Sequence, residues 1–229
     1  CGVWGYNTFL TALTHGIPQV VQTHFDAAQT INNVERHGVT YMPGLATIYQ
    51  RMINHETFST DRVRTLSKAS VGFIGMGYDE DVFKAIERQT GINICQPYGL
   101  SEGNSQIFMG DPDDPVEIRK RVGGPMVFAE GEQIRIIDPD SNEPCPDGEV
   151  GEICLQGYNV TDRYLDKPDQ TEAAFDENGW FHTGDLGLRD AENGYIYYQS
   201  RMDDALRIRG FLVAPREIET VINEHVDIE

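Results

Sequence analysis

A change in sequence pattern near residue 115 constrains the fold of this chain more than any other feature. Before it, short apolar runs alternate with amphipathic segments, as strands and helices do in α/β proteins with a largely parallel sheet. After it, short β-rich runs are separated by turn clusters such as residues 138–142, which is typical of a small β-barrel or sandwich. We therefore expect an α/β subdomain over residues 1–115, a β-rich subdomain over 116–200 and the start of an α+β domain over 201–229.

Periodicity and capping residues place the individual elements. Apolar spacing predicts helices over 6–13, 27–37, 45–53 and 80–89, the second of them capped by Asp26. Short buried runs predict strands over 19–22, 39–42, 68–73 and 93–96, followed by strands over 132–137 and 150–155. A further amphipathic helix is expected to start at 215–219.

Composition restricts the class of protein. The formal net charge of −19 argues against binding to nucleic acid or to an anionic membrane surface by charge alone. No apolar run approaches the roughly 20 residues that a membrane-spanning helix needs. The four cysteines form no CxxC pair and no Cys/His cluster in the sequence, so we expect neither a zinc site nor a disulfide framework. The opening residues resemble the middle of a fold, and we expect a fragment of a longer cytoplasmic protein.

The first candidate motif, residues 96–102 (Gln-Pro-Tyr-Gly-Leu-Ser-Glu), directly follows a predicted strand. Ligands of open α/β sheets bind beyond the carboxyl ends of strands, so a polar loop there is well placed. Tyr98 offers a flat ring, Ser101 a hydroxyl and Glu102 an oxygen ligand suited to Mg²⁺. An ordinary strand-to-loop turn explains the same residues equally well.

The second motif, residues 179–185 (Gly-Trp-Phe-His-Thr-Gly-Asp), ends in a carboxylate after a glycine turn. An acidic residue in this setting can accept hydrogen bonds from both hydroxyls of a ribose. The alternative is an aspartate that stabilises its own turn.

The third motif begins at residues 200–204 (Ser-Arg-Met-Asp-Asp) and continues through Arg207, Arg209 and residues 215–219. An arginine suits phosphate or ribose oxygens. A charged linker between two domains is the alternative.

In this order and at these separations, the three motifs resemble the adenylate-forming superfamily of acyl-CoA synthetases, peptide-synthetase adenylation domains and firefly-type luciferases. Residues 150–157, Tyr164, Thr171 and the stretch from Phe25 to Tyr49 add to the likeness, which covers nearly the whole chain. The chain looks most like an acyl-CoA synthetase. The resemblance implies an ATP-dependent acid–CoA ligase that makes an acyl-adenylate and pyrophosphate, then transfers the acyl group to coenzyme A.

The resemblance also implies roles for single residues. Ser101, Glu102 and Arg201 would serve catalysis, with Glu102 holding Mg²⁺, and Asp203 would be the hinge of a carboxy-terminal lid that begins in residues 201–229. In the ATP site, Tyr98 and Gly99 would lie beside adenine, and a wall of Gly75, Met76 and Gly77 would cover the opposite face of the base. Asp185 would bind the ribose, and Arg201 would reach a ribose or phosphate oxygen. Position alone suggests Trp4, Met42 and Phe73 as liners of a pocket for a fatty or aryl acid, although each is equally a core residue.

The chain departs from the superfamily pattern in several places. Ser101 stands where threonine is commoner, Ser200 replaces a glycine, and residues 72–77 depart from the usual Gly-Gly-Ala-Pro. The superfamily's phosphate loop and catalytic lysine are expected upstream and downstream, so we expect these 229 residues alone to be inactive. An adenylation domain that loads a carrier-protein thiol and a non-catalytic relative remain alternatives.

Overall fold

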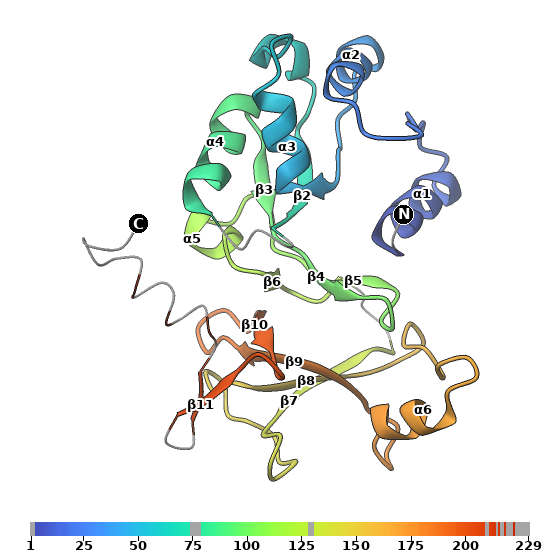
Figure 1. Ribbon diagram of the computed structural model, residues 1–229, viewed down its shortest axis with the longest axis vertical. Coiled ribbons are helices and arrows are strands. Elements are labelled where there is room, and N and C mark those ends of the chain that lie inside the picture. Colours follow the sequence, from blue (N-terminus) through green and yellow to red (C-terminus); the bar gives the residue numbers. More distant parts are fainter. Residues whose placement is uncertain are drawn as a thin grey trace.

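The computed structural model describes residues 3–73, 79–127, 131–208 and 211–213, together with the helical positions 215, 218 and 222. Two sheets dominate the described chain, and Figure 1 shows them stacked along the long axis of the molecule. A small hairpin lies between them. Among the described residues, no helix combines the length and the apolar character needed to cross a bilayer.

The first sheet is parallel and has the strand order β1-β2-β3, formed by Gly44–Leu45, Lys68–Gly72 and Asn93–Cys95. Three helices flank it in Figure 1, namely α2 (Ala27–His37), α3 (Ala46–Ile53) and α4 (Glu80–Thr90). A 3-10 helix (Thr60–Val63) lies between α3 and β2 in the chain. We call this part the α/β layer.

Local sequence explains where the two longest helices of this layer begin and end. The Asp26 side chain accepts a hydrogen bond from the backbone N–H of Gln29 at 2.7 Å, and Asp79 caps α4 through Val82 at 3.0 Å. Both helices end at a glycine in the left-handed region, Gly38 at φ 61° and Gly91 at φ 75°. Their apolar faces meet the sheet in a core that includes Ile31, Val34, Tyr49, Met52, Val71, Phe83, Ile86 and Ile94.

The second sheet is antiparallel, with the order β6-β10-β9-β8-β7. Its strands are Gly123–Gly124 (β6), Gln133–Ile137 (β7), Gly151–Gln156 (β8), Phe181–Arg189 (β9) and Ile196–Arg201 (β10). Two short helices belong to the same stretch of chain, α5 (Val116–Arg119) and α6 (Pro168–Ala174). The sheet has the curvature of a half-barrel, as Figure 1 shows for β7, β8 and β9.

The hairpin between the sheets consists of β4 (Tyr98–Leu100) and β5 (Ser105–Phe108). Tyr98, Ile107 and Phe108 share a second hydrophobic core with side chains of the antiparallel sheet, among them Ile136, Ile153, Leu155 and Ile196. Residues 98–108 therefore pack with the β-rich region, although their sequence precedes the change near residue 115. The domain boundaries at 115 and 200 stay a prediction.

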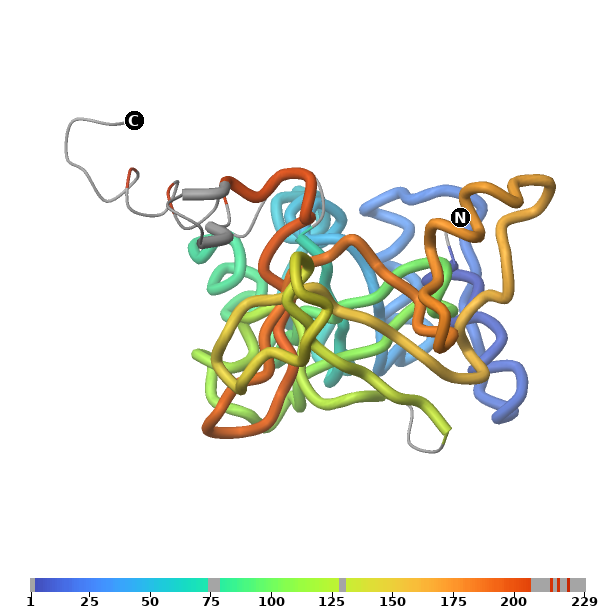
Figure 2. Tube along the Cα trace, turned by 90° about the horizontal axis from the view of Figure 1, so that it is seen from below, coloured from blue at the N-terminus to red at the C-terminus, as the bar shows by residue number. Residues whose placement is uncertain are grey.

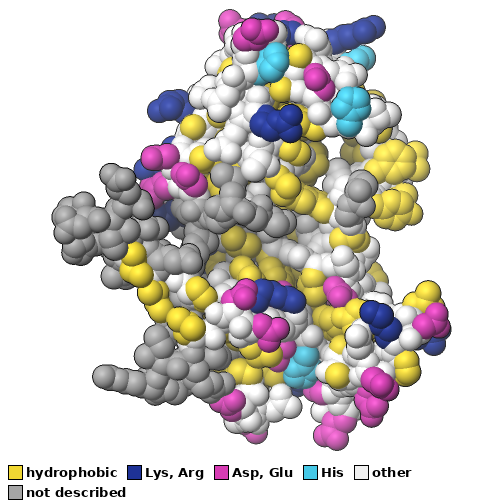
Figure 3. All heavy atoms as spheres, viewed as in Figure 1, with side chains coloured by type: hydrophobic (Ala, Val, Ile, Leu, Met, Phe, Trp, Pro, Cys, Tyr) yellow, Lys and Arg dark blue, Asp and Glu magenta, His cyan; other side chains and the backbone are white. Residues whose placement is uncertain are grey.

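The amino-terminal helix α1 (Val3–Thr14) lies apart from α2–α4 in Figure 1, and its described contacts are chiefly with β5. Hydrophobic side chains gather on the surface at α1 in Figure 3, where Tyr6, Phe9 and Leu13 are exposed. In Figure 2, α1 and the segment after β10 lie on opposite sides of the molecule. That last segment forms a two-stranded antiparallel pair, β11 (Leu206–Ile208) and β12 (Phe211–Val213).

All four predicted helices of the first 100 residues are confirmed, with ends within three residues of those predicted. The strands predicted over 68–73, 93–96, 132–137 and 150–155 are confirmed within one residue. Two predicted strands are wrong. Residues 19–22 are irregular and expose Val20 and Val21, since no described strand pairs with them. In 39–42 only Tyr41 forms an isolated parallel bridge, with Lys68, and the strand itself comes later, at β1.

Candidate functional site

The three sequence motifs meet at one buried carboxylate. Asp185 on β9 is only 5% exposed, and its Oδ2 accepts a hydrogen bond of 2.8 Å from the phenol of Tyr98 on β4. Its Oδ1 accepts a hydrogen bond from Arg201 Nη1 on β10, also 2.8 Å long. The fold thus brings together Tyr98, Asp185 and Arg201, which lie 87 and 16 positions apart in the sequence.

The electrostatics of this cluster follow from burial and from Asp185. Burial raises the pKa of the Tyr98 phenol well above its ordinary value, and the neighbouring Asp185 carboxylate raises that pKa further. The hydrogen bond to Asp185 raises the pKa of Arg201, whose side chain is 55% exposed. A carboxylate has about four lone-pair positions, and the bonds from Tyr98 and Arg201 use one on each oxygen, so Asp185 can still accept hydrogen bonds from a ligand.

Aromatic rings cover both faces of Tyr98. The ring of Phe108 lies 5.4 Å from it between centroids, and the ring of Tyr198 lies 5.6 Å away, both stacked nearly parallel. The sequence did not single out Tyr198, although the aromatic run just before Arg201 was an available signal. A flat ligand ring can reach Tyr98 only if one of these neighbours moves, and Tyr198 is the less buried of the two.

Glu102 lies in the loop after β4 and is half-buried. Its Oε1 accepts a hydrogen bond of 2.9 Å from the phenol of Tyr164, and its backbone oxygen accepts one of 2.7 Å from the N–H of Thr161. Burial, together with the hydrogen bond to Glu102, raises the pKa of Tyr164. A half-buried carboxylate whose second oxygen accepts no hydrogen bond from the described residues fits a hard cation such as Mg²⁺.

The neighbours of Glu102 in the motif are shaped by close backbone approach. A Cβ atom at Gly99 would lie 1.7 Å from the carbonyl oxygen of Ser105, so only glycine fits there. Ser101 is exposed, and its carbonyl accepts a hydrogen bond from Asn104 in the turn. The hairpin therefore holds Ser101 and Glu102 at its solvent edge.

The comparisons with known proteins agree with this geometry. Residues 3–165 match the family model described as AMP-binding enzyme, which is more than half of the chain.

This chain belongs to the AMP-binding enzyme family.

Its relatives include named CoA ligases. It is 28% identical to 4-coumarate–CoA ligase 5 of Oryza sativa subsp. japonica over 97% of this chain and 41% of that protein. It is 33% identical to the sulfoacetate–CoA ligase of Cupriavidus necator over 95% of this chain and 41% of that protein. The chain thus spans about two fifths of the length of these relatives.

Solved structures resemble it closely. The O-succinylbenzoate coenzyme A synthetase (MenE) of Bacillus subtilis, unliganded, gives a TM-score of 0.80 at 26% identity over 98% of this chain and 47% of that one. The same enzyme in complex with ATP and a magnesium ion gives 0.79 at 26% identity, over 98% of this chain and 44% of that one.

Other residues predicted for the site lie outside the cluster around Asp185. Asp203 is exposed in the turn that joins β10 to β11. Met42 and Phe73 pack in the core of the α/β layer, and Trp4 is half-buried on α1. The predicted wall of Gly75, Met76 and Gly77 lies outside the described residues.

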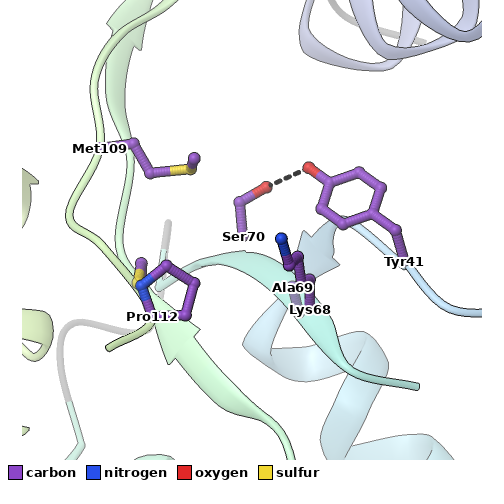
Figure 4. A pocket seen from close by; sticks show the side chains of 7 residues that line it. Tyr41, Lys68, Ala69, Ser70, Met109 and Pro112 are labelled. Atoms are coloured by element: carbon purple, nitrogen blue, oxygen red, sulfur yellow. Dashed lines mark hydrogen bonds between the residues drawn. The ribbon is translucent and has the colours of Figure 1, made fainter. Parts of the chain in front are cut away.

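A separate cavity lies against the parallel sheet and has a volume of about 160 Å³. Figure 4 shows Met109 and Pro112 facing Ser70 and Tyr41 across it, with the Tyr41 phenol 2.9 Å from Ser70 Oγ. Of the predicted site residues that the structure describes, none lines this cavity.

Proposed function

We propose that this chain forms part of an AMP-forming acid–CoA ligase, which converts an acid and ATP to an acyl-adenylate and pyrophosphate and then transfers the acyl group to coenzyme A. The observation that carries the proposal is the convergence of Tyr98, Asp185 and Arg201 on one buried carboxylate cluster. The names of the relatives support the reaction class, and the likeness to MenE bound to ATP and magnesium supports the substrates.

Asp185 is the proposed ribose ligand, because its remaining lone pairs can accept both hydroxyls of the sugar. Tyr98 and Gly99 are the proposed adenine neighbours, with Tyr198 moving aside or stacking on the other face of the base. Residues 75–77 remain the proposed wall against the opposite face of adenine.

Ser101, Glu102 and Arg201 are the proposed catalytic residues. A carboxylate oxygen of the acid attacks the α-phosphorus of ATP, and the bond from that phosphorus to the bridging oxygen of pyrophosphate breaks. This chemistry needs positioning and charge neutralisation more than a protein nucleophile. Glu102, oriented by Tyr164, is the proposed ligand of Mg²⁺, which would neutralise phosphate charge. Arg201 is exposed enough to reach a phosphate or ribose oxygen while it stays bonded to Asp185.

Asp203 is the proposed hinge of the lid, because it is exposed in a turn directly after the sheet. Asp203→Pro in an active ligase is expected to spare adenylate formation and abolish thioester formation, since proline fixes φ where the lid rotates. A parallel loss of both half-reactions would exclude the hinge role.

The acid is proposed to be a fatty or aryl acid, with Trp4, Met42 and Phe73 as candidate liners. A carrier-protein thiol in place of coenzyme A remains the second candidate acceptor. The proposed compartment is the cytoplasm, which agrees with the free thiols of Cys95, Cys145 and Cys154.

The test is a hybrid enzyme in which residues 1–229 replace the matching stretch of the sulfoacetate–CoA ligase from Cupriavidus necator. We expect acid-dependent exchange of labelled pyrophosphate into ATP, and Asp185→Ala should lower both ATP affinity and exchange by about tenfold or more. Glu143→Gln, an exposed acid elsewhere, is the control. A folded hybrid that binds ATP but exchanges nothing with a panel of fatty and aryl acids would contradict the proposal.

A further inference from the structure

The ladder between β8 and β9 is interrupted beside Asp185. Glu152 lies opposite Leu186, and Cys154 lies opposite His182. Between these pairs β8 has one residue, Ile153, whereas β9 has the three residues 183–185. This is a β-bulge, a feature that redirects a side chain and leaves backbone groups without ladder partners. On its other edge Asp185 keeps its pairing with Arg201 of β10.

Side chains replace the missing ladder bonds. The N–H of Gly184 donates to Glu152 Oε1 at 2.9 Å, and the N–H of Asp185 donates to Thr183 Oγ1 at 3.0 Å. The hydroxyl of Thr183 in turn donates to the carbonyl of Ile153 at 2.7 Å. Gly184 takes φ 67°, which permits the sharp turn of the bulge. Thr183 and Gly184 are thus bonded directly to β8, and Asp185 is bonded to Thr183 within β9.

The burial of Glu152 needs a reason. It is only 4% exposed, and burying a carboxylate is unfavourable unless its oxygens are hydrogen-bonded. Oε1 holds Gly184, and Oε2 lies 2.8 Å from His182 Nδ1, so both oxygens bind the residues that lead into Asp185. Glu152 itself makes no described contact with Tyr98 or Arg201.

Glu152, Cys154 and His182 place three potential metal ligands within 4.8 Å of one another. A metal role is disfavoured by the surroundings of Cys154. The guanidinium of Arg135 lies beside the thiol as a positive charge, which opposes a bound cation. The Glu152 carboxylate therefore serves as a hydrogen-bond acceptor for the backbone of the bulge.

We propose that Glu152 is a positioning residue for Asp185: with Thr183 it fixes the bulge at 183–185 and so aims the Asp185 carboxylate at the ribose. This inference rests on the proposed ribose contact of Asp185. Glu152 acts through the backbone of Gly184 and touches no substrate.

The experiment measures the affinity of the 229-residue chain for ATP and for 2′,3′-dideoxy-ATP, both with Mg²⁺, by isothermal titration calorimetry. The wild-type chain is expected to prefer ATP by about tenfold or more, because dideoxy-ATP offers no hydroxyl to Asp185. Glu152→Ala is expected to reduce this preference to below about threefold, while the affinity for dideoxy-ATP stays unchanged. A general loss of structure would weaken both ligands alike.

Three variants complete the design. Glu152→Gln keeps an oxygen for Gly184 and is expected to retain most of the preference, and the exposed Glu143→Gln is the charge-matched control. Thr183→Val removes the other support of the bulge without changing side-chain shape. It is expected to lower the preference as Glu152→Ala does, and it decides the question if Glu152→Ala does not fold.

The outcomes separate the two proposals. A wild-type chain without preference for ATP would overturn the ribose role of Asp185, and this inference with it. A wild-type preference for ATP that persists in folded Glu152→Ala would overturn this inference alone. If Glu152→Ala does not fold, a preference that persists in Thr183→Val would do the same. Stoichiometric Zn²⁺ binding that Cys154→Ser abolishes would also overturn it, by assigning the carboxylate to a metal.

Discussion

The α/β layer and the antiparallel sheet bury different kinds of side chain. The α/β layer buries aliphatic and aromatic residues together with the neutral polar side chains of Thr30, Ser70 and Thr90, and Arg119 of the neighbouring α5 is buried against its Glu87. The antiparallel sheet buries Glu152, Asp185 and the hydroxyls of Thr183 and Ser200 near the edge where the motifs meet. Buried polar groups add little to stability compared with apolar packing. The difference indicates that the first region stabilises the fold, whereas the second gives up some stability to hold the proposed binding site.

The largest effect on stability is expected in the α/β layer. Phe83 is fully buried and stacks on Phe73, so Phe83→Ala should lower the free energy of unfolding by about 3–5 kcal/mol through lost burial and a cavity. Chemical denaturation followed by circular dichroism measures this. Phe9→Ala on exposed α1 is the matched control and should cost less than about 1 kcal/mol. Similar losses for both variants would mean that this layer does not carry the stability.

The next effect compares buried thiols in the two regions. Burial raises the pKa of Cys95, in the α/β layer, and of Cys154, in the antiparallel sheet, from 9.0 to about 12. Between these pH values the unfolded chain has lost protons that the folded chain keeps, so the free energy of unfolding falls as pH rises. Each thiol should contribute at most about 1.4 kcal/mol per pH unit, and nothing below about pH 9.

Denaturation curves at pH 7, 9, 10 and 11 test this expectation. Cys95→Ala and Cys154→Ala should each reduce the alkaline loss of stability by a similar amount, because desolvation is the main cause of both shifts. If only one variant reduced it, the two interiors would differ in their solvation. If neither did, the thiols would ionise as freely in the folded chain as in the unfolded one.

A smaller effect is expected at Tyr164. Tyr164→Phe removes the hydrogen bond to Glu102, which should cost about 0.5–1.5 kcal/mol of stability and weaken the dependence of ATP affinity on Mg²⁺. Tyr158→Phe, in which the ring is 74% exposed, is the control. An unchanged Mg²⁺ dependence in Tyr164→Phe would remove Tyr164 from the support of Glu102.

The same two regions differ in how far the sequence predicted them. In the α/β layer, periodicity and the caps at Asp26 and Gly38 are local signals, so the helices were predicted within a few residues. The strands at 19–22 and 39–42 were wrong because a strand needs a partner, and pairing is not a local property.

The candidate site was predicted in part. Tyr98, Asp185 and Arg201 were named in advance, and the structure brings them together, but their roles toward ATP stay predictions. The stacking of Tyr198 on Tyr98 and the bulge held by Glu152 were missed, since both depend on strand register. Spacing in the sequence also did not reveal that Cys154 and His182 lie opposite each other across two strands, and the expectation of no zinc site stays a prediction.

The most direct test of the central claim is made at Asp185. Asp185→Asn keeps an oxygen for one neighbour but breaks the pair with Arg201, whose exposed guanidinium can be solvated by water, so the free energy of unfolding should fall by about 1–3 kcal/mol. ATP affinity, measured by calorimetry on the same protein, should fall by about tenfold or more. A loss of several kcal/mol of stability with unchanged ATP affinity would show that Asp185 serves the fold and would contradict the account.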